Sequence, residues 1–138
     1  MNWQAVLHIG FLWLGIAALL YVIQSASQFI AGIPWLGLAP LHALTIGYFS
    51  TIVLGMATRV TLGHSGRALV ADRITWWLFM GFQGAVVLRV AGDIWTGWPM
   101  AIWHPHLLAG LVWLICFGIW FANYAPIYWR PRVDGKPG

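Results

Sequence analysis

The chain has 138 residues, of which 61% are hydrophobic and only 7% charged, and no stretch shows the polar face that a water-soluble domain would need. Its net charge of +4 comes from seven basic and three acidic residues, and the basic ones are spread over the ends of apolar segments, which argues against a nucleic-acid partner. Membrane lipid is therefore the expected surrounding. The expected fold is an all-α integral membrane four-helix bundle.

Four segments are long and apolar enough to span a bilayer, and turns rich in Gly and Pro separate them. They predict a single transmembrane domain over residues 1–138, with residues 125–138 as a tail. The expected helices cover residues 3–24, 41–62, 74–92 and 101–124.

The first expected helix belongs to a stretch of 58 residues without any charged side chain. It ends near Ser25-Ala26-Ser27, which loosely resembles a signal-peptidase site. Because no basic region precedes the apolar run, and the run is long enough to span, we interpret it as a retained helix. His8 lies near its start.

The second expected helix has His42 at one end and His64 just beyond the other. If the helix is an unbroken α-helix, the two imidazoles share a face but lie roughly 33 Å apart, so they cannot share one ligand. Between them runs a stripe that would suit either a macrocycle or ordinary helix packing: Thr45, Phe49, Val53, Met56 and Val60. Another row, Gly47, Thr51 and Gly55, is typical of a helix-packing seam.

The positions of the basic residues predict how the chain is oriented in the membrane. By the positive-inside rule, both termini and the tail are expected in the cytoplasm. On the opposite side, Arg89 lies about one turn inside the third helix, where it could bind a haem propionate or form an i,i+4 pair with Asp93. The residues expected on the cytoplasmic side are Arg59, Arg67, Arg73, Arg130, Arg132 and Lys136.

The last expected helix begins near His104 and His106, which point in nearly opposite directions if both are helical. We favour His106 as the one facing the bundle, because Gly110, Trp113 and Phe117 continue its face. An alternative takes Met100, His104 and His106 together as a copper site, since thioether and imidazole ligands suit copper. The single cysteine, Cys116, is interpreted as a small packing residue.

Histidines in or near spans are costly and usually serve a purpose. The expected threading places His8 and His64 in one leaflet, and His42, His104 and His106 in the other. Each histidine alone could simply reach the headgroups or bind a carbonyl group. As two clusters they favour haem ligation, with His42 and His106 as one axial pair and His8 and His64 as a second.

Arg59 and Arg67, beside His64, could bind haem propionates or serve only as topology determinants. The chain has no glutamate, no paired carboxylates, no phosphate-binding glycine loop and no Ser-His-Asp set. We therefore expect no catalytic acid or base side chain.

The stretch LHALTIGYFSTIVLGMATRVTLGHSGRALVADR, residues 41–73, resembles the signature of the NnrS family. The tail YAPIYWRPRVDGKPG and the opening LHIGF resemble that family's C-terminus and the start of the corresponding helix. The resemblance covers the last four helices of longer family members. Its matched positions are His42, Arg59, His64 and Arg67.

That resemblance implies a haem-binding membrane protein in nitric oxide metabolism. We expect haem b, in a bacterial inner membrane protein that binds or responds to nitric oxide or transfers electrons in denitrification. One alternative is a cofactor-free accessory subunit of a respiratory oxidase or reductase, and the other is a copper-binding membrane protein. A homo-oligomer or a larger respiratory complex is expected, because the chain has more small-residue positions than four mutually packed helices need.

Overall fold

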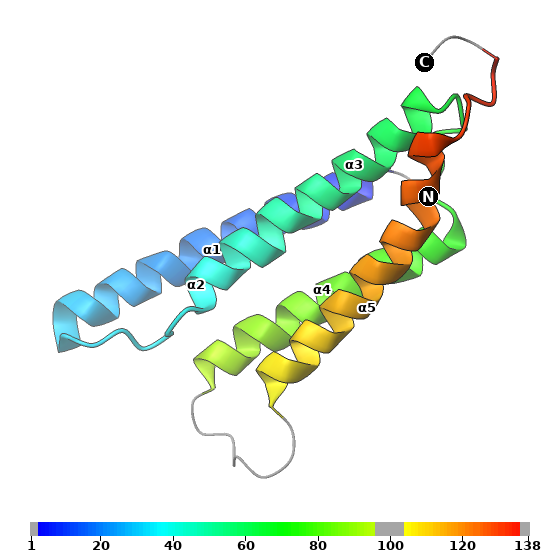
Figure 1. Cartoon of the computed structure of the whole chain (residues 1–138). Helices are drawn as coiled ribbons and strands as arrows, with labels where there is room; N and C mark the ends of the chain where they lie inside the picture. The colour runs from blue at the N-terminus through cyan, green and yellow to red at the C-terminus, as the bar shows by residue number, and fades with distance from the viewer. Residues whose placement is uncertain (1–2, 96–103, 136–138) are drawn as a thin grey trace.

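The computed structural model of the chain describes residues 3–95 and 104–135, and every regular element in these ranges is a helix (Figure 1). Residues 39–64 are helical without a break and are called the second helix below. Four helices are long and apolar enough to cross a membrane, which confirms the predicted number. The elements are α1 Trp3–Ala31, α2 Ala39–His42, the π-helix η1 Ala43–Ser50, α3 Thr51–His64, α4 Arg73–Ile94, α5 Pro105–Tyr124 and the 3-10 helix η2 Ala125–Trp129.

Helix α1 continues for two turns beyond the predicted end at residue 24. The polar side chains there bind the following connection instead of ending the helix: Gln24 donates to the Gly37 carbonyl over 2.8 Å and accepts from the Leu36 amide over 2.8 Å. The helix ends before Gly32, whose φ of 70° is the left-handed conformation common just after a helix. The connection therefore folds back along α1.

The second helix differs from the predicted unbroken α-helix in its middle, because η1 makes π-type hydrogen bonds over eight residues. The Ser50 hydroxyl donates to the Thr45 carbonyl, five residues earlier, over 3.0 Å. Each residue of a π-helix turns the chain by less than in an α-helix, so the faces before and after η1 are offset. His42 and His64 consequently do not share the simple face that six α-helical turns would give.

The other two spans start at conventional helix signals. The Asp72 carboxylate caps α4 by accepting from the Thr75 amide over 2.7 Å, and Pro105 occupies the first turn of α5. The predicted end of the α-helical part at Tyr124 is confirmed, although η2 extends the last span to Trp129. The predicted start of that span, residues 101–103, lies outside the described residues.

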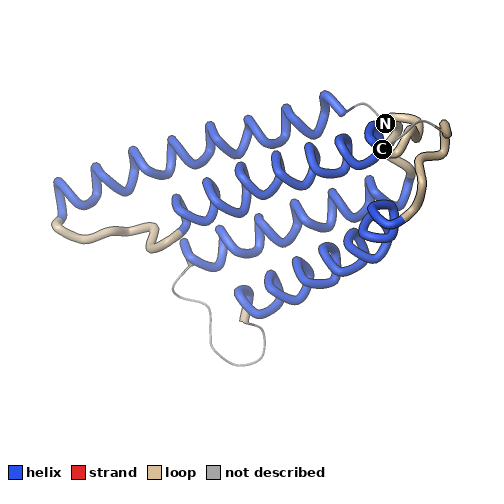
Figure 2. Tube along the Cα trace, turned by 45° about the horizontal axis from the view of Figure 1, so that its top comes forward, coloured by secondary structure: helices blue, strands red, loops and turns tan. Residues whose placement is uncertain are grey.

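The core lies where α1, the second helix and α4 meet, and α5 packs along α4 (Figures 1 and 2). A buried series of hydrogen bonds joins α1, the second helix and α4: the Trp13 indole donates to Gln83 over 2.7 Å, and Gln83 donates to the Thr51 hydroxyl over 3.1 Å. Since apolar surroundings make unpaired polar groups costly, this series fixes the relative register of the three helices.

The glycine seam of the second helix packs against α1. A Cβ at Gly47 would lie 2.8 Å from the Trp13 ring, and one at Gly55 would lie 2.5 Å from Val6. The close approach of α1 and the second helix therefore needs glycine at both positions. The packing-seam interpretation is confirmed.

The two described ends of the chain lie at the same end of the molecule (Figure 2), as four spans require. Cytoplasmic termini stay a prediction. We expect alkaline phosphatase fused to the C-terminus to be inactive, because that enzyme works only after translocation, while a cytoplasmic reporter at the same position should be active. The reverse pattern would overturn the orientation.

Candidate functional site

A polar cluster lies at the end of the molecule where α2, α4 and α5 come together. Its centre is Asp93, in the last turn of α4, whose side chain is only 7% exposed. One carboxylate oxygen binds His42 Nδ1 at 2.5 Å and the other binds His106 Nε2 at 2.9 Å. A single carboxylate thus joins two histidines that are 64 residues apart in sequence.

Arg89, one turn before Asp93, completes the cluster. Its Nη2 lies 3.3 Å from His42 Nε2 and 3.8 Å from Asp93 Oδ1. A guanidinium group can only donate, so His42 Nε2 must accept, and the ring proton must be on Nδ1, where it is donated to Asp93. The carboxylate therefore fixes both the tautomer and the orientation of His42.

The backbone around the cluster is shaped by glycine. A Cβ at Gly92 would lie 3.0 Å from Pro105 and 3.3 Å from His106 Nε2, so a larger residue would push away the first turn of α5. Gly37, at φ 52°, lies against the Asp93 carbonyl, where its own Cβ would be 3.4 Å away. These two positions allow α5 and the first connection to close around the end of α4.

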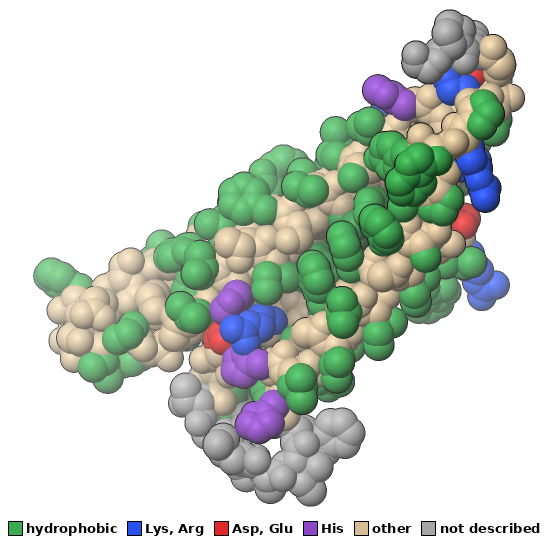
Figure 3. Space-filling view, viewed as in Figure 1, with side chains coloured by type: hydrophobic (Ala, Val, Ile, Leu, Met, Phe, Trp, Pro, Cys, Tyr) green, Lys and Arg blue, Asp and Glu red, His purple; other side chains and the backbone are tan. Residues whose placement is uncertain are grey.

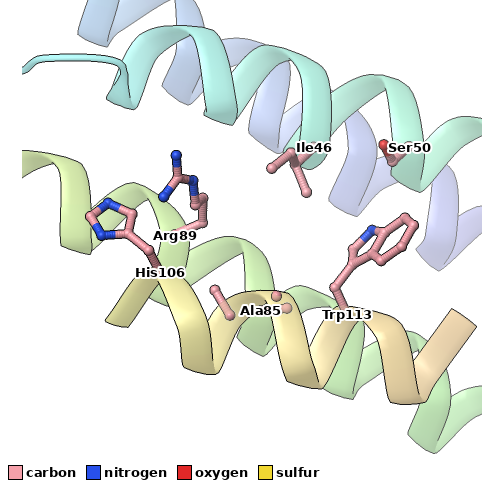
Figure 4. Close-up of a pocket in the computed structure, with 8 residues that line it drawn as sticks. Ile46, Ser50, Ala85, Arg89, His106 and Trp113 are labelled. Atoms are coloured by element: carbon pink, nitrogen blue, oxygen red, sulfur yellow. The ribbon is translucent and has the colours of Figure 1, made fainter. Parts of the chain in front are cut away.

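A groove leads away from the cluster between the second helix and α5, with α4 as its floor. Its two adjoining parts have volumes of about 340 Å³ and 380 Å³ and share Ser50 and Trp113. Figure 4 shows Arg89 and His106 at one end of the first part, and Ser50 and Trp113 at the other. At the far end of the groove, the Trp120 indole donates to the Thr58 hydroxyl over 2.7 Å and brings α5 against α3.

Stacked aromatic rings form the α5 wall of the groove. Trp113 and Phe117 have centroids 5.1 Å apart and are nearly parallel at 5°, and Phe117 and Trp120 are 5.7 Å apart at 30°. The opposite wall carries Phe49 and Val53 from the second helix. The groove is thus an apolar, aromatic space with one charged end, which suits a flat ligand that carries anionic groups.

The structure brings together three predicted site residues, His42, His106 and Arg89. As predicted, His106 faces the groove with Gly110, Trp113 and Phe117, whereas His104 does not line it; both imidazoles are exposed. From the predicted stripe of the second helix, Phe49 and Val53 do line the groove. Ile46 and Ser50, and not Thr45, line its first part.

The second predicted pair, His8 and His64, is not brought together. Gly10 lies opposite Ile52 and Gly55 opposite Val6, so His8 is level with the first turn of α3, whereas His64 is at its end, roughly 15 Å further along the helix axis. His8 is exposed and its Nδ1 lies 2.6 Å from the Gln4 carbonyl oxygen. Ligation of a haem by this pair stays a prediction.

His64 instead lines a pocket with Arg130 and Arg132 of the tail. Arg59 is exposed on α3, and Arg67 lies in the connection that follows it. Met100, from the predicted copper cluster, lies outside the described residues. Within residues 3–95 and 104–135, no three His, Cys, Asp or Glu side chains are arranged to hold a metal ion.

The sequence pattern predicts Asp93 as a partner of Arg89 but does not predict its central position between two histidines. The sequence contains a signal that could have identified it. Of the three carboxylates, Asp72 caps a helix and Asp134 lies in the tail, which leaves Asp93 as the one at the end of a span on the opposite side. An acidic group at such a position usually has a histidine or arginine partner.

Figure 3 shows the two polar ends: histidine, acidic and basic side chains gather beside the groove, and mostly basic ones lie at the opposite end. Together, fold and site define a helical protein with four membrane-spanning-type helices and a His-Asp-His-Arg cluster at the head of an aromatic groove. Residues 2–132 match the family model described as NnrS protein, and the chain belongs to the NnrS family. No curated protein and no solved structure matches the chain.

The match covers most of the chain and confirms the predicted resemblance. Family membership and the four apolar helices together support, in general terms, a membrane protein linked to nitric oxide.

Proposed function

We propose that the chain is a haem b protein of the bacterial inner membrane, and that it holds haem in the groove between the second helix and α5. The observation that carries the proposal is His42, whose Nδ1 proton is donated to Asp93. Its Nε2, which accepts from Arg89 at 3.3 Å in this structure, would be the ligating atom once Arg89 turns to a propionate. Histidines that ligate metals commonly have their second ring nitrogen bound to a carboxylate in this way. A bound haem would supply an iron centre that can bind nitric oxide or pass an electron.

The side chains around the groove fit such a group in their chemistry. Arg89 offers a cation to a propionate, and the stacked rings of α5 offer aromatic surface to a macrocycle. His42 and His106 both bind the same carboxylate, so ligation by both requires His106 to use Nδ1 or to give up its bond to Asp93. We therefore favour His42 Nε2 as the first ligand and His106 as the second.

Substitution of His42 tests the proposal that the chain binds haem. We expect the purified chain, reconstituted with haemin, to show a Soret band, and His42→Ala to remove or shift it. His104→Ala is the matched control, because His104 is exposed and lies at the end of α5 that carries His106. This substitution should leave the spectrum nearly intact. The measurement is a haem titration followed by visible spectroscopy, together with metal analysis.

Other outcomes favour the alternatives. Equal loss from both substitutions would contradict His42 as the specific ligand. Copper without haem would favour the copper-binding protein. Neither haem nor metal in a folded chain would favour the cofactor-free accessory subunit.

Association of the chain with another copy or with a respiratory partner stays a proposal, and fewer glycine positions support it. Gly47 and Gly55 are used for packing within the chain, whereas Gly84, Gly110 and Gly118 have open space above them. We propose that the faces of α4 and α5 that carry Gly84 and Gly118 pack against another copy or a respiratory partner. Native mass spectrometry from mild detergent should show an oligomer, and a haem-loaded monomer would contradict it.

A further inference from the structure

A second pocket, of about 200 Å³, lies at the opposite end of the molecule from the groove's polar cluster. The tail folds over the end of α3 there: the Val133 amide donates to the Ser65 carbonyl over 3.1 Å, and the Tyr128 and Thr61 hydroxyl groups lie 2.6 Å apart. We call the space between the end of α3 and the tail the tail pocket. Its polar lining is Thr61, His64, Ser65, Tyr128, Arg130 and Arg132.

The donors that remain free in the tail pocket belong to its arginine and histidine side chains. The Thr61 and Ser65 hydroxyls already donate to carbonyl groups of their own helix over 2.7 Å and 2.9 Å. Arg132 uses Nε and Nη2 on Asp134, at 2.9 Å and 2.6 Å, so Asp134 fixes the guanidinium and leaves Nη1 unused in that pair. This hydrogen bond also raises the pKa of Arg132 above its ordinary value.

Arg130 adds a second guanidinium group, for which the described residues provide no hydrogen bond or salt bridge. None of the residues that line the pocket is acidic. Two guanidinium groups and an imidazole around one space provide the donors that a phosphate group prefers.

Apolar surface continues from the tail pocket along α3. Val60, one turn before His64, lines the pocket and is 45% exposed, and Met56 and Val53 follow at 43% and 65%. Spacings of three and four residues place these side chains on one stripe of an α-helix. A ligand with a phosphate head and an apolar tail would thus meet cations first and exposed aliphatic surface next.

We infer that the tail pocket binds the phosphate group of an anionic phospholipid, whose acyl chain lies along the stripe Val53, Met56 and Val60. Free phosphate offers the same head chemistry but would leave the stripe uncovered. The site is at the end of the apolar spans, which is the depth of lipid headgroups. The tail pocket shares no residue with the groove proposed for haem, whereas the far end of the apolar stripe, Val53, also lines that groove.

The test uses the full chain in a neutral detergent, with phosphatidylglycerol, phosphatidylcholine and inorganic phosphate as separate probes. We expect native mass spectrometry to show retained phosphatidylglycerol and little phosphatidylcholine. Arg130→Gln should weaken phosphatidylglycerol binding about tenfold, as expected for loss of one charge-assisted contact. Arg73→Gln is the matched control, because Arg73 is exposed and does not line the pocket.

Two results would overturn the inference. An equal loss with Arg73→Gln would mean that diffuse charge, not the tail pocket, attracts the lipid. Displacement of bound phosphatidylglycerol by inorganic phosphate at equal concentration would mean that a free anion is the ligand. Haem spectra measured on the same variants should not change. A failure of the lipid inference can therefore be distinguished from a failure of the haem proposal.

Discussion

Asp93→Ala is expected to destabilise the protein by about 2 kcal/mol, because it removes the common partner of two imidazoles and leaves Arg89 near no other carboxylate. Loss of one member of a fully buried charge pair costs about 3–5 kcal/mol. The smaller value is expected here because Arg89 is 25% and His106 is 42% exposed, so both can find water or headgroups. Thermal unfolding in detergent, followed by tryptophan fluorescence, measures the difference.

Two further variants sharpen the result for Asp93. Asp93→Asn keeps the shape and one acceptor but loses the charge, so its stability should fall between the parent and Asp93→Ala. Asp134→Ala also removes a carboxylate with an arginine partner, but this pair is in the tail and about 30% exposed, so the change should be within about 1 kcal/mol. Equal effects of Asp93→Ala and Asp134→Ala would refute a special role of the buried carboxylate.

The number of spans could be predicted from the sequence, whereas the end of α1 could not. Length and hydropathy determine the number of spans, because about 20 apolar residues are needed to cross the hydrocarbon core. The end of α1 was missed because Gln24 and Ser27 look like the polar residues of a turn. In the structure they are helical, and their side chains bind the backbone of the following connection.

The π-helical segment also could not be predicted from residue pattern. Nothing in ALTIGYFS distinguishes it from an α-helix by composition, since the difference lies in which carbonyl each amide selects. The consequence for the site is specific. At α-helical spacing, Ile46 would lie about 40° and Ser50 about 80° around the helix axis from His42, so Ser50 is the lining residue that an α-helix would not favour.

The candidate site was predicted in part. Helical geometry was enough to choose His106 over His104 as the inward residue, because the face of His106 continues into Gly110 and Trp113. The role of Asp93 depends on α2, α4 and α5 meeting at one point. That is a tertiary relationship over 51 residues on one side and 13 on the other, which local patterns do not contain.

Gly47→Ala is expected to destabilise the protein by about 1–3 kcal/mol, the cost of overpacking a close helix contact. The new Cβ would lie 2.8 Å from Trp13 Cδ2. The indole cannot simply move away, because its nitrogen is held by Gln83 over 2.7 Å, and Gln83 in turn binds Thr51. Relief of the clash would therefore disturb the buried series of hydrogen bonds that joins α1, the second helix and α4.

The matched control for Gly47→Ala is Gly84→Ala, the same chemical change at a helical glycine with no atom within 4 Å of the new Cβ. In the monomer, the higher helix propensity of alanine should stabilise the protein there, by up to about 1 kcal/mol. The two substitutions should thus shift the unfolding temperature in opposite directions when measured in the same detergent. A stabilising Gly47→Ala would show that α1 and the second helix do not pack as closely as this structure places them. A destabilising Gly84→Ala in an oligomer, but not in the monomer, would place Gly84 in an interface between copies.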